Sequence, residues 1–186
     1  MKVQQKPIIL LDRDGVINQD SKDYVKSVEE WIPLAGSIKA IAALSNAGFK
    51  IYVVTNQSGI SRGYYSEETL AAMHQKMSDL VAAEGGQIDG IEYCPHGPDD
   101  ACHCRKPKSG MIEAIEKSLG MDFTEQPAIM VGDSLRDLQA GQARGCAPVL
   151  VLTGNGRETQ YKNIDFHFDI YTDLAAFAIA TLHKYS

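Results

Sequence analysis

Two aspartates, Asp12 and Asp14, follow the apolar run Ile8–Leu11 and are separated by one residue. In an extended chain, residues i and i+2 point to the same side, so the two carboxylates are predicted to lie together. Close carboxylates repel each other and need a cation or a shared proton between them, which indicates a functional site. A solvated turn is the alternative, whereas a calcium loop is disfavoured because Val16 occupies the next alternate position.

Polar residues also follow two other apolar runs. Thr55 comes after 50–54, and Asp133 comes after 128–131 with one glycine between them. The carboxyl ends of neighbouring parallel strands meet at one edge of a sheet, where ligands bind in open α/β folds. The hydroxyl of Thr55 and the backbone N–H groups of the turn that contains Gly59 are suited to binding phosphate oxygens.

These residues together predict a phosphoryl-transfer site. An aspartate that attacks a phosphate dianion needs a hard cation to neutralise the repulsion, and Asp12 and Asp133 are natural Mg²⁺ ligands. Asp12 is expected to be the nucleophile that forms an aspartyl-phosphate. Asp14 would protonate the leaving alcohol and then activate water. Thr55 and Lys106 would stabilise charge on the transferred oxygens.

A second candidate site is a cluster of metal-binding residue types between positions 94 and 104. Cys94, His96, Cys102 and Cys104 offer four zinc ligands, and a closed set of four indicates a structural zinc that fixes a loop rich in Gly and Pro. His103 is a competing ligand. The alternative is an oxidisable cluster without metal, although clustered cysteines in a reducing compartment more often bind metal.

Composition limits the classes of partner. A net charge of −6 and a pI near 5.3 disfavour a dedicated nucleic-acid-binding protein, because phosphate backbones need a basic surface. Positive charge is concentrated locally at Arg105, Lys106 and Lys108, where an anionic small molecule could be held. The first residues lack the apolar core of a signal peptide, and no apolar run is long enough to span a membrane. We therefore expect a cytoplasmic protein without membrane contact, folded as one domain over 1–186.

Strand and helix patterns alternate along the chain. After the strand Ile8–Leu11, a helix is expected from an N-cap at Ser37 to Gly48, followed by a buried strand at 50–54. A strand, helix and strand in succession predict a parallel crossover unit. Further helices are expected after Ser66, Ser109, Ser134 and Asp173, and further strands at 88–93, 128–131, 149–152 and 166–170. The predicted fold is α/β, a doubly wound three-layer sandwich with a mainly parallel sheet.

Three other features are interpreted as structural. His74 is expected at the surface of its helix, and Cys146 is expected to be a buried, inert thiol. The segment Gly154-Asn-Gly156 is interpreted as a turn, because Thr159 stands where a dinucleotide fingerprint has its third glycine.

The motifs resemble those of a known superfamily. Asp12-Arg-Asp14-Gly, Thr55-Asn56 after a strand, a downstream lysine, and Gly-Asp133 with Asp137 are similar to the four motifs of haloacid-dehalogenase-like (HAD) phosphohydrolases. More narrowly, the segments 11–15, 54–59, 93–96 and 104–107 resemble the heptose bisphosphate phosphatase family. That resemblance implies a magnesium-dependent, zinc-containing enzyme that removes the 7-phosphate of D-glycero-D-manno-heptose 1,7-bisphosphate during synthesis of nucleotide-activated heptose for lipopolysaccharide or related glycans.

The resemblance also implies roles for individual residues. Asp12, the backbone carbonyl of Asp14 and Asp133 would hold magnesium, and Arg105 would contact the substrate. Zinc would bind Cys94, His96, Cys102 and Cys104. The candidate substrate contacts are Arg13, Asp20, Tyr24, Asn56, Gln57, Ser58, Arg105 and Ser134. The sequence between Asp12 and Thr55 leaves no room for a large cap domain, so short loops are expected to select the substrate.

Two other functions remain open at this stage. Histidinol-phosphate phosphatase has a phosphatase domain that resembles this chain down to the zinc loop, and Asp20 or Asp23 could bind either substrate. A zinc-stabilised binding protein with an inactive phosphatase fold is disfavoured because every motif residue is present. No exposed apolar segment marks an interface, so we expect a monomer.

Overall fold

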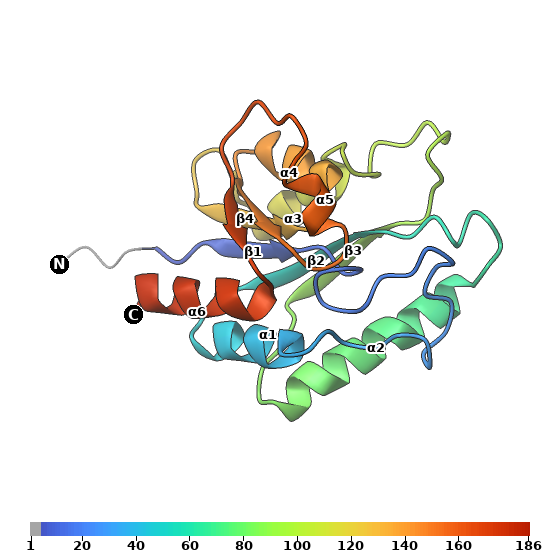
Figure 1. Ribbon diagram of the computed structural model, residues 1–186, viewed down its shortest axis with the longest axis horizontal. Coiled ribbons are helices and arrows are strands. Elements are labelled where there is room, and N and C mark those ends of the chain that lie inside the picture. The colour runs from blue at the N-terminus through green and yellow to red at the C-terminus, as the bar shows by residue number, and fades with distance from the viewer. Residues whose placement is uncertain (1–4) are drawn as a thin grey trace.

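The computed structural model describes residues 5–186 and contains a six-stranded parallel sheet (Figure 1). The strands lie in the order β3-β2-β1-β4-β5-β6, and every neighbouring pair is parallel. Their bounds are β1 Ile8–Leu11, β2 Ile51–Asn56, β3 Gly90–Cys94, β4 Ala128–Gly132, β5 Ala147–Val151 and β6 Asp169–Tyr171. The predicted α/β fold with a parallel sheet is confirmed.

Helices cover both faces of the sheet, which makes the sandwich three layers thick. They are α1 Ser37–Asn46, α2 Glu67–Ala83, α3 Gly110–Leu119, α4 Leu135–Gln142, α5 Gly156–Thr159 and α6 Leu174–Lys184. Figure 1 shows α1, α2 and α6 together on one face, with α3, α4 and α5 on the other. In the described part of the chain, no helix combines the length and apolar character needed to cross a membrane.

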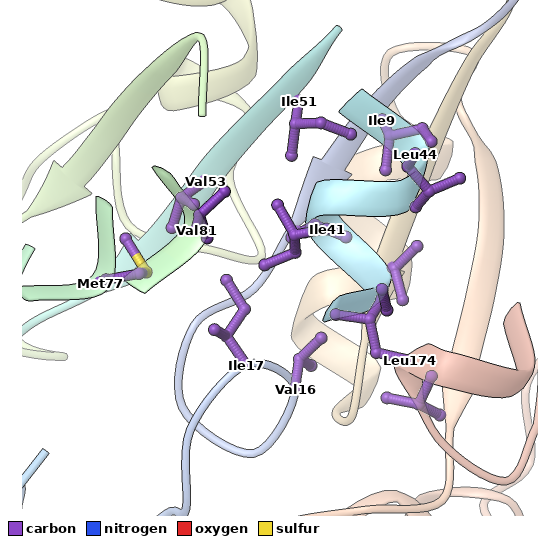
Figure 2. Close-up of a cluster of buried hydrophobic side chains, with 14 of the residues drawn as sticks. Ile9, Val16, Ile17, Ile41, Leu44, Ile51, Val53, Met77, Val81 and Leu174 are labelled. Atoms are coloured by element: carbon purple, nitrogen blue, oxygen red, sulfur yellow. The ribbon is translucent and has the colours of Figure 1, made fainter. Parts of the chain in front are cut away.

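The central strand β1 is buried on both faces and separates two apolar cores. Ile9 and Leu11 belong to the core under α1, α2 and α6, while Ile8 and Leu10 belong to the core under α3 and α4. Figure 2 shows part of the first core, where Ile41 lies among side chains from the sheet and from neighbouring helices. The period-2 alternation of strand side chains explains why an unbroken apolar run is required here.

The strand order reverses direction at β1. The chain goes from β1 to β2 and β3 on one side, then returns so that β4, β5 and β6 lie on the other side. In open α/β sheets the crevice at such a switch point, beyond the carboxyl ends of the strands, is the usual ligand site. Asp12 follows β1 and Asp133 follows β4, so both carboxylates lie at this crevice.

Several predicted boundaries shift. Gly36, with a positive φ of 77°, is the N-cap of α1, and Ser37 is its first residue because the hydroxyl instead donates to the carbonyl of Ile17 at 2.6 Å. The last strand is Asp169–Tyr171, later than the predicted 166–170. Ser66 and Asp173 are N-caps as expected, with side chains that accept from backbone N–H groups one turn ahead.

A long loop between β1 and α1 passes over the carboxyl edge of the sheet. Asn18 forms isolated bridges with Asp14 and Pro33, and Trp31 is fully buried beneath the loop. The ammonium group of Lys76 on α2 donates to the carbonyls of Val28 and Trp31 at 2.8 and 2.7 Å. These contacts hold the loop in place without regular secondary structure.

Candidate active site

The carboxylate of Asp12 lies at the end of β1 against a buried lysine. Its Oδ1 accepts from Lys106 Nζ at 2.8 Å, and this ammonium also lies 2.7 Å from Asp137 Oδ1 and donates to the carbonyl of Val54. Burial, and then the nearby Asp137, raise the pKa of Asp12 well above its ordinary value, although Lys106 opposes this. Burial lowers the pKa of Lys106, but Asp12 and Asp137 outweigh it and the net shift is upward. Lys106 is therefore a permanent cation beside Asp12.

Asp14 is held in a different environment. Its Oδ1 accepts from Arg13 Nη2 at 2.8 Å and from Asn18 Nδ2 at 2.9 Å, and its Oδ2 accepts from Gln57 Nε2 at 2.9 Å. Burial raises the pKa of Asp14, yet the charge of Arg13 and these hydrogen bonds outweigh burial, so the net pKa is lowered. The two aspartates thus have pKa shifts of opposite direction, which is typical of groups with different acid–base roles.

Two polar residues of the site, Thr55 and Asn56, lie at the end of β2. Thr55 is fully buried, and its hydroxyl accepts from Gln57 Nε2 at 2.9 Å. The side chain of Asn56 pairs with the backbone of Lys106, donating to its carbonyl at 3.1 Å and accepting from its N–H at 3.0 Å. Both residues lie inside β2, which extends two residues beyond the predicted strand, so the sheet itself fixes their positions.

Asp133 lies at the end of β4 among backbone groups. Its Oδ2 accepts from the backbone N–H of Asn155 at 2.8 Å. A Cβ added to Gly15 or Gly154 would come within 2.3 or 2.1 Å of the same oxygen, so both positions require glycine. Burial, followed by the charge of Asp137, raises the pKa of Asp133 to about 7.

The carboxylate of Asp137 contacts both Lys106 and the start of α4. Its Oδ2 accepts from the backbone N–H groups of Asp133 and Ser134 and from the Ser134 hydroxyl, which forms a capping box at the start of α4. Burial raises the pKa of Asp137, but Lys106 and these hydrogen bonds lower it overall. Asp137 was predicted from the sequence as a motif residue only, without a role in the site.

These carboxylates fit a magnesium ion. Oxygens of Asp12, Asp133 and Asp137 lie within 4.8 Å of one another, and a hard divalent cation prefers such ligands. Three buried carboxylates face one ammonium, so the cluster has an excess of negative charge that a cation would neutralise. Asp137 is already engaged by Lys106 and the start of α4, which leaves Asp12 and Asp133 with the freer oxygens.

A cleft of about 350 Å³ opens above these residues. All eight predicted substrate contacts lie in its wall: Arg13, Asp20, Tyr24, Asn56, Gln57, Ser58, Arg105 and Ser134. Asp12, Asp14, Lys106 and Asp133 also line it, whereas Thr55 lies beneath. The guanidinium of Arg13 is fully buried and bonds to Asp14, so this residue supports the wall from inside.

The cleft contains residues that the sequence analysis missed. Arg62 and Arg136 join Arg105 in its wall, so three guanidinium groups line the cleft in addition to the buried guanidinium of Arg13, which is bound to Asp14. Asn155 was interpreted as part of a turn, but it is the N-cap residue of α5 and binds Asp133. The rule that polar residues follow the carboxyl ends of parallel strands also applies after β5 and would have found Asn155.

One wall of the cleft joins two loops through aromatic rings. Tyr24 has a positive φ of 67°, which is uncommon for a bulky residue and marks local strain. Its ring packs edge-on against Tyr64 with centroids 5.1 Å apart, and the guanidinium of Arg62 lies 5.9 Å from its centroid. The loop around residue 24 and the loop around residue 62 therefore form one surface.

The second predicted cluster assembles in the loop after β3. The Sγ atom of Cys94 lies 3.0 Å from Sγ of Cys104 and 3.8 Å from Sγ of Cys102. Nδ1 of His96 lies 3.2 Å from Sγ of Cys104. Tetrahedral Zn–S bonds of about 2.3 Å put two sulfurs about 3.8 Å apart, which the Cys94–Cys102 separation matches, while the Cys94–Cys104 separation is shorter. Burial raises the pKa of Cys94 to about 12, and zinc would favour its thiolate form. The four residues fit a structural zinc.

The competing ligand is excluded by position. The side chain of His103 is 71% exposed, and its Nε2 lies 2.9 Å from Glu113 Oε2 on α3. The loop that carries the Cys–His cluster is tied to the cleft because Arg105 Nη1 donates to the carbonyl of His96 at 3.2 Å.

The prediction that His74 lies at the surface was wrong. His74 shares the buried side of α2 with Met73 and Met77 and is only 8% exposed. Its Nε2 lies 3.3 Å from Nη1 of Arg13. The misinterpretation arose because a single polar residue in a helix was assumed to face solvent, whereas a buried arginine provides it with a partner. The buried position of Cys146 is confirmed.

Comparison with known proteins shows the family to which this chain belongs. A model of the HAD-hydrolase-like family matches residues 103–176. The D-glycero-beta-D-manno-heptose-1,7-bisphosphate 7-phosphatase of Pseudomonas aeruginosa is 52% identical over 177 residues, which are 95% of this chain and 98% of that protein. The chain belongs to this heptose bisphosphate phosphatase family.

Other members of the family agree in sequence and in fold. The same enzyme from Bordetella bronchiseptica is 55% identical over 152 residues, covering 82% of this chain and 84% of that protein. A crystal structure of the D,D-heptose 1,7-bisphosphate phosphatase from B. bronchiseptica, complexed with magnesium and phosphate, has a TM-score of 0.91 and 50% identity. It covers 96% of this chain and 99% of that one, so the family fold extends over nearly the whole chain.

Proposed function

We propose that this protein is a magnesium-dependent phosphatase that removes the 7-phosphate of D-glycero-D-manno-heptose 1,7-bisphosphate, in the synthesis of ADP- or GDP-activated heptose. Family membership supports this substrate, and the B. bronchiseptica relative contains magnesium and phosphate. The observation that carries the proposal is one cleft lined by Asp12 and Lys106 and also by Arg62, Arg105 and Arg136. A bisphosphate needs one anion site at the reacting group and a second one at a distance.

Asp12 is the proposed nucleophile. It would attack phosphorus to form an aspartyl-phosphate, while Lys106 and Thr55 would stabilise the charge on the transferred oxygens. Lys106 already contacts Asp12 at 2.8 Å, so its charge is in place before the reaction. Magnesium held by Asp12, the Asp14 backbone carbonyl and Asp133 would neutralise the repulsion between nucleophile and substrate.

Asp14 is the proposed acid and base. In the free protein its lowered pKa keeps it ionised, which is the form that activates water in the second half of the reaction. The leaving alcohol needs a proton in the first half. An anionic substrate beside Asp14 raises the pKa of this carboxyl and so favours the uptake of that proton.

Zinc on Cys94, His96, Cys102 and Cys104 would fix the loop that positions Arg105 and Lys106. The remaining candidate contacts, including Tyr24 and Ser58, would bind the sugar from the walls of the cleft. The single-domain organisation, the monomeric state and the cytoplasmic location stay predictions.

Histidinol phosphate is the second candidate substrate. Its cationic amine and imidazole would favour a cleft lined by carboxylates, and Asp20 is available for that purpose. The three guanidinium groups of Arg62, Arg105 and Arg136 instead favour a second phosphate. The cleft therefore supports the bisphosphate over histidinol phosphate.

The test is magnesium-dependent phosphate release by the purified protein from both anomers of heptose 1,7-bisphosphate and from histidinol phosphate. We expect preference for a bisphosphate anomer, and loss of turnover in Asp12→Asn with the fold retained. Preference for histidinol phosphate would overturn the substrate, and turnover by Asp12→Asn would overturn the covalent mechanism.

A further inference from the structure

A buried chain of polar groups leads from α2 to the carboxylate of Asp14. His74 contacts Nη1 of Arg13 at 3.3 Å, and Arg13 donates to Asp14 Oδ1 from Nε at 3.2 Å and from Nη2 at 2.8 Å. Arg13 is fully buried and His74 is 8% exposed. Such a chain inside the protein is costly unless each of its donors is satisfied.

The direction of the His74 contact follows from the chemistry of its partner. A guanidinium has only donors, so Nε2 of His74 must accept and the ring proton must lie on Nδ1. Burial, and then the charge of Arg13, lower the pKa of His74 to about 3, which keeps the ring neutral at physiological pH. Within residues 5–186, His74 is the hydrogen-bond partner of Arg13 Nη1, and without it this donor would be buried and unpaired.

The second oxygen of Asp14 is held by Gln57, whose Oε1 also accepts from Arg13 Nη2 at 3.4 Å. Gln57 donates to Asp14 Oδ2 at 2.9 Å, and its own Oε1 accepts from the hydroxyl of Tyr65 at 2.5 Å. Rotation of the Asp14 carboxylate is therefore resisted on one oxygen by Gln57 and on the other by Arg13. The orientation of Arg13 in turn depends on His74, which is anchored in α2 between Met73 and Met77 of the apolar core.

We propose that His74 is a positioning residue for phosphoryl transfer, which acts through Arg13 to hold the Asp14 carboxylate in the orientation needed for proton transfer to the leaving group. The inference rests on the acid–base role given to Asp14 under the proposed function. His74 does not line the cleft that contains Asp12, and it would not touch the substrate. Its effect is therefore expected in turnover and not in substrate affinity.

The test compares His74→Leu, His74→Gln and His74→Asn with the wild type. Leucine removes the acceptor, glutamine places an amide oxygen near the position of Nε2, and asparagine is one methylene too short to do so. We expect kcat for the bisphosphate to fall about 10-fold in His74→Leu and His74→Asn, with KM changed less than about 2-fold, because a misplaced catalytic group lowers the rate of the chemical step. Glutamine should restore most of the loss.

A second readout separates positioning from a general loosening of the protein. 4-Nitrophenolate leaves without taking up a proton, so single-turnover release from 4-nitrophenyl phosphate should fall less than about 2-fold in His74→Leu. The matched control is Met77→Leu, a volume-conserving change on the same buried side of α2 at a residue that is not among the hydrogen-bond partners of Arg13 in the described residues. It should leave kcat for both substrates unchanged.

Equal losses with both substrates, or no loss in His74→Leu, would overturn the inference. So would equal activity of His74→Gln and His74→Asn, a comparison that stays valid even if His74→Leu fails to fold. The variant Asp14→Asn tests the proposed acid–base role of Asp14 separately from the positioning role of His74. If Asp14→Asn retains wild-type turnover, the proposed acid–base role fails; if it loses turnover while His74→Leu does not, only the present inference fails.

Discussion

Replacing Lys106 with methionine would remove a buried ammonium group that lies 2.8 Å from Asp12 and 2.7 Å from Asp137. Methionine fills the space of the aliphatic stem, so the main loss is charge. Without the ammonium, Asp12, Asp133 and Asp137 would face one another uncompensated in magnesium-free buffer. Asp137, whose pKa Lys106 lowers in the wild type, would then take up a proton that it does not carry there.

The magnitude follows from the proton that must be bound. An aspartate in the unfolded chain has a pKa of about 3.9, and each pH unit above this makes protonation in the folded state about 1.4 kcal/mol more costly. The free energy of unfolding should therefore fall by about 4 kcal/mol at pH 7, and by only about 1.5 kcal/mol at pH 5. A carboxyl with a raised folded pKa destabilises the protein less as pH falls, while Lys106 itself stays charged over this range. The variant should thus approach the wild type in acid.

The assay is urea denaturation followed by fluorescence of Trp31, which is the single tryptophan and is fully buried. Lys117→Met, at an exposed position of α3, is the control and should change stability by less than about 0.5 kcal/mol. An equal loss of stability at pH 5 and pH 7 would refute the reasoning, because it would show that packing and not charge is responsible.

Two further outcomes concern the loop after β3. Removing zinc with a chelator should abolish most turnover and make the segment 94–108 susceptible to protease, because the metal is expected to hold the loop that presents Lys106. Adding zinc back should reverse both effects. Unchanged activity in protein whose zinc loss is measured by metal analysis would contradict this role. Deleting 97–101 should change the preference among sugar phosphates more than it changes phosphate release from an aryl phosphate, and equal losses on both would show that these residues do not select the substrate.

The positions of the main candidate catalytic side chains could be predicted because they depend on the sheet alone. Asp12, Thr55 and Asp133 each end or follow an apolar run, and parallel strands bring such ends to one edge regardless of how the loops fold. The Cys–His cluster depends on residue types at short spacing, so Cys94 and its neighbours were also evident from the sequence.

The contacts that failed to appear in the sequence analysis depend on buried polar pairing over long distances in the chain. His74 meets Arg13, and Asn155 meets Asp133, through hydrogen bonds between segments whose relative positions only the folded chain sets. Periodicity detects apolar faces, so it assigns a polar residue to solvent by default. Ser37 shows the same failure on a smaller scale, because its hydroxyl prefers the carbonyl of Ile17 to a capping role.

The position of Lys106 directly after the Cys–His cluster has a physical explanation. A buried ammonium must meet Asp12 and Asp137 at once, which requires its backbone to be fixed, and Asn56 at the end of β2 fixes it from one side with two hydrogen bonds. From the other side, Cys104 precedes Lys106 by two residues and is bound into the Cys–His cluster. The segment between Cys104 and Lys106 is too short to absorb movement of the loop, so a change in metal occupancy would be transmitted to the ammonium group beside Asp12, the proposed nucleophile. A structural zinc site far from Lys106 in the sequence could not have this effect, which is why we expect zinc to influence turnover as well as stability.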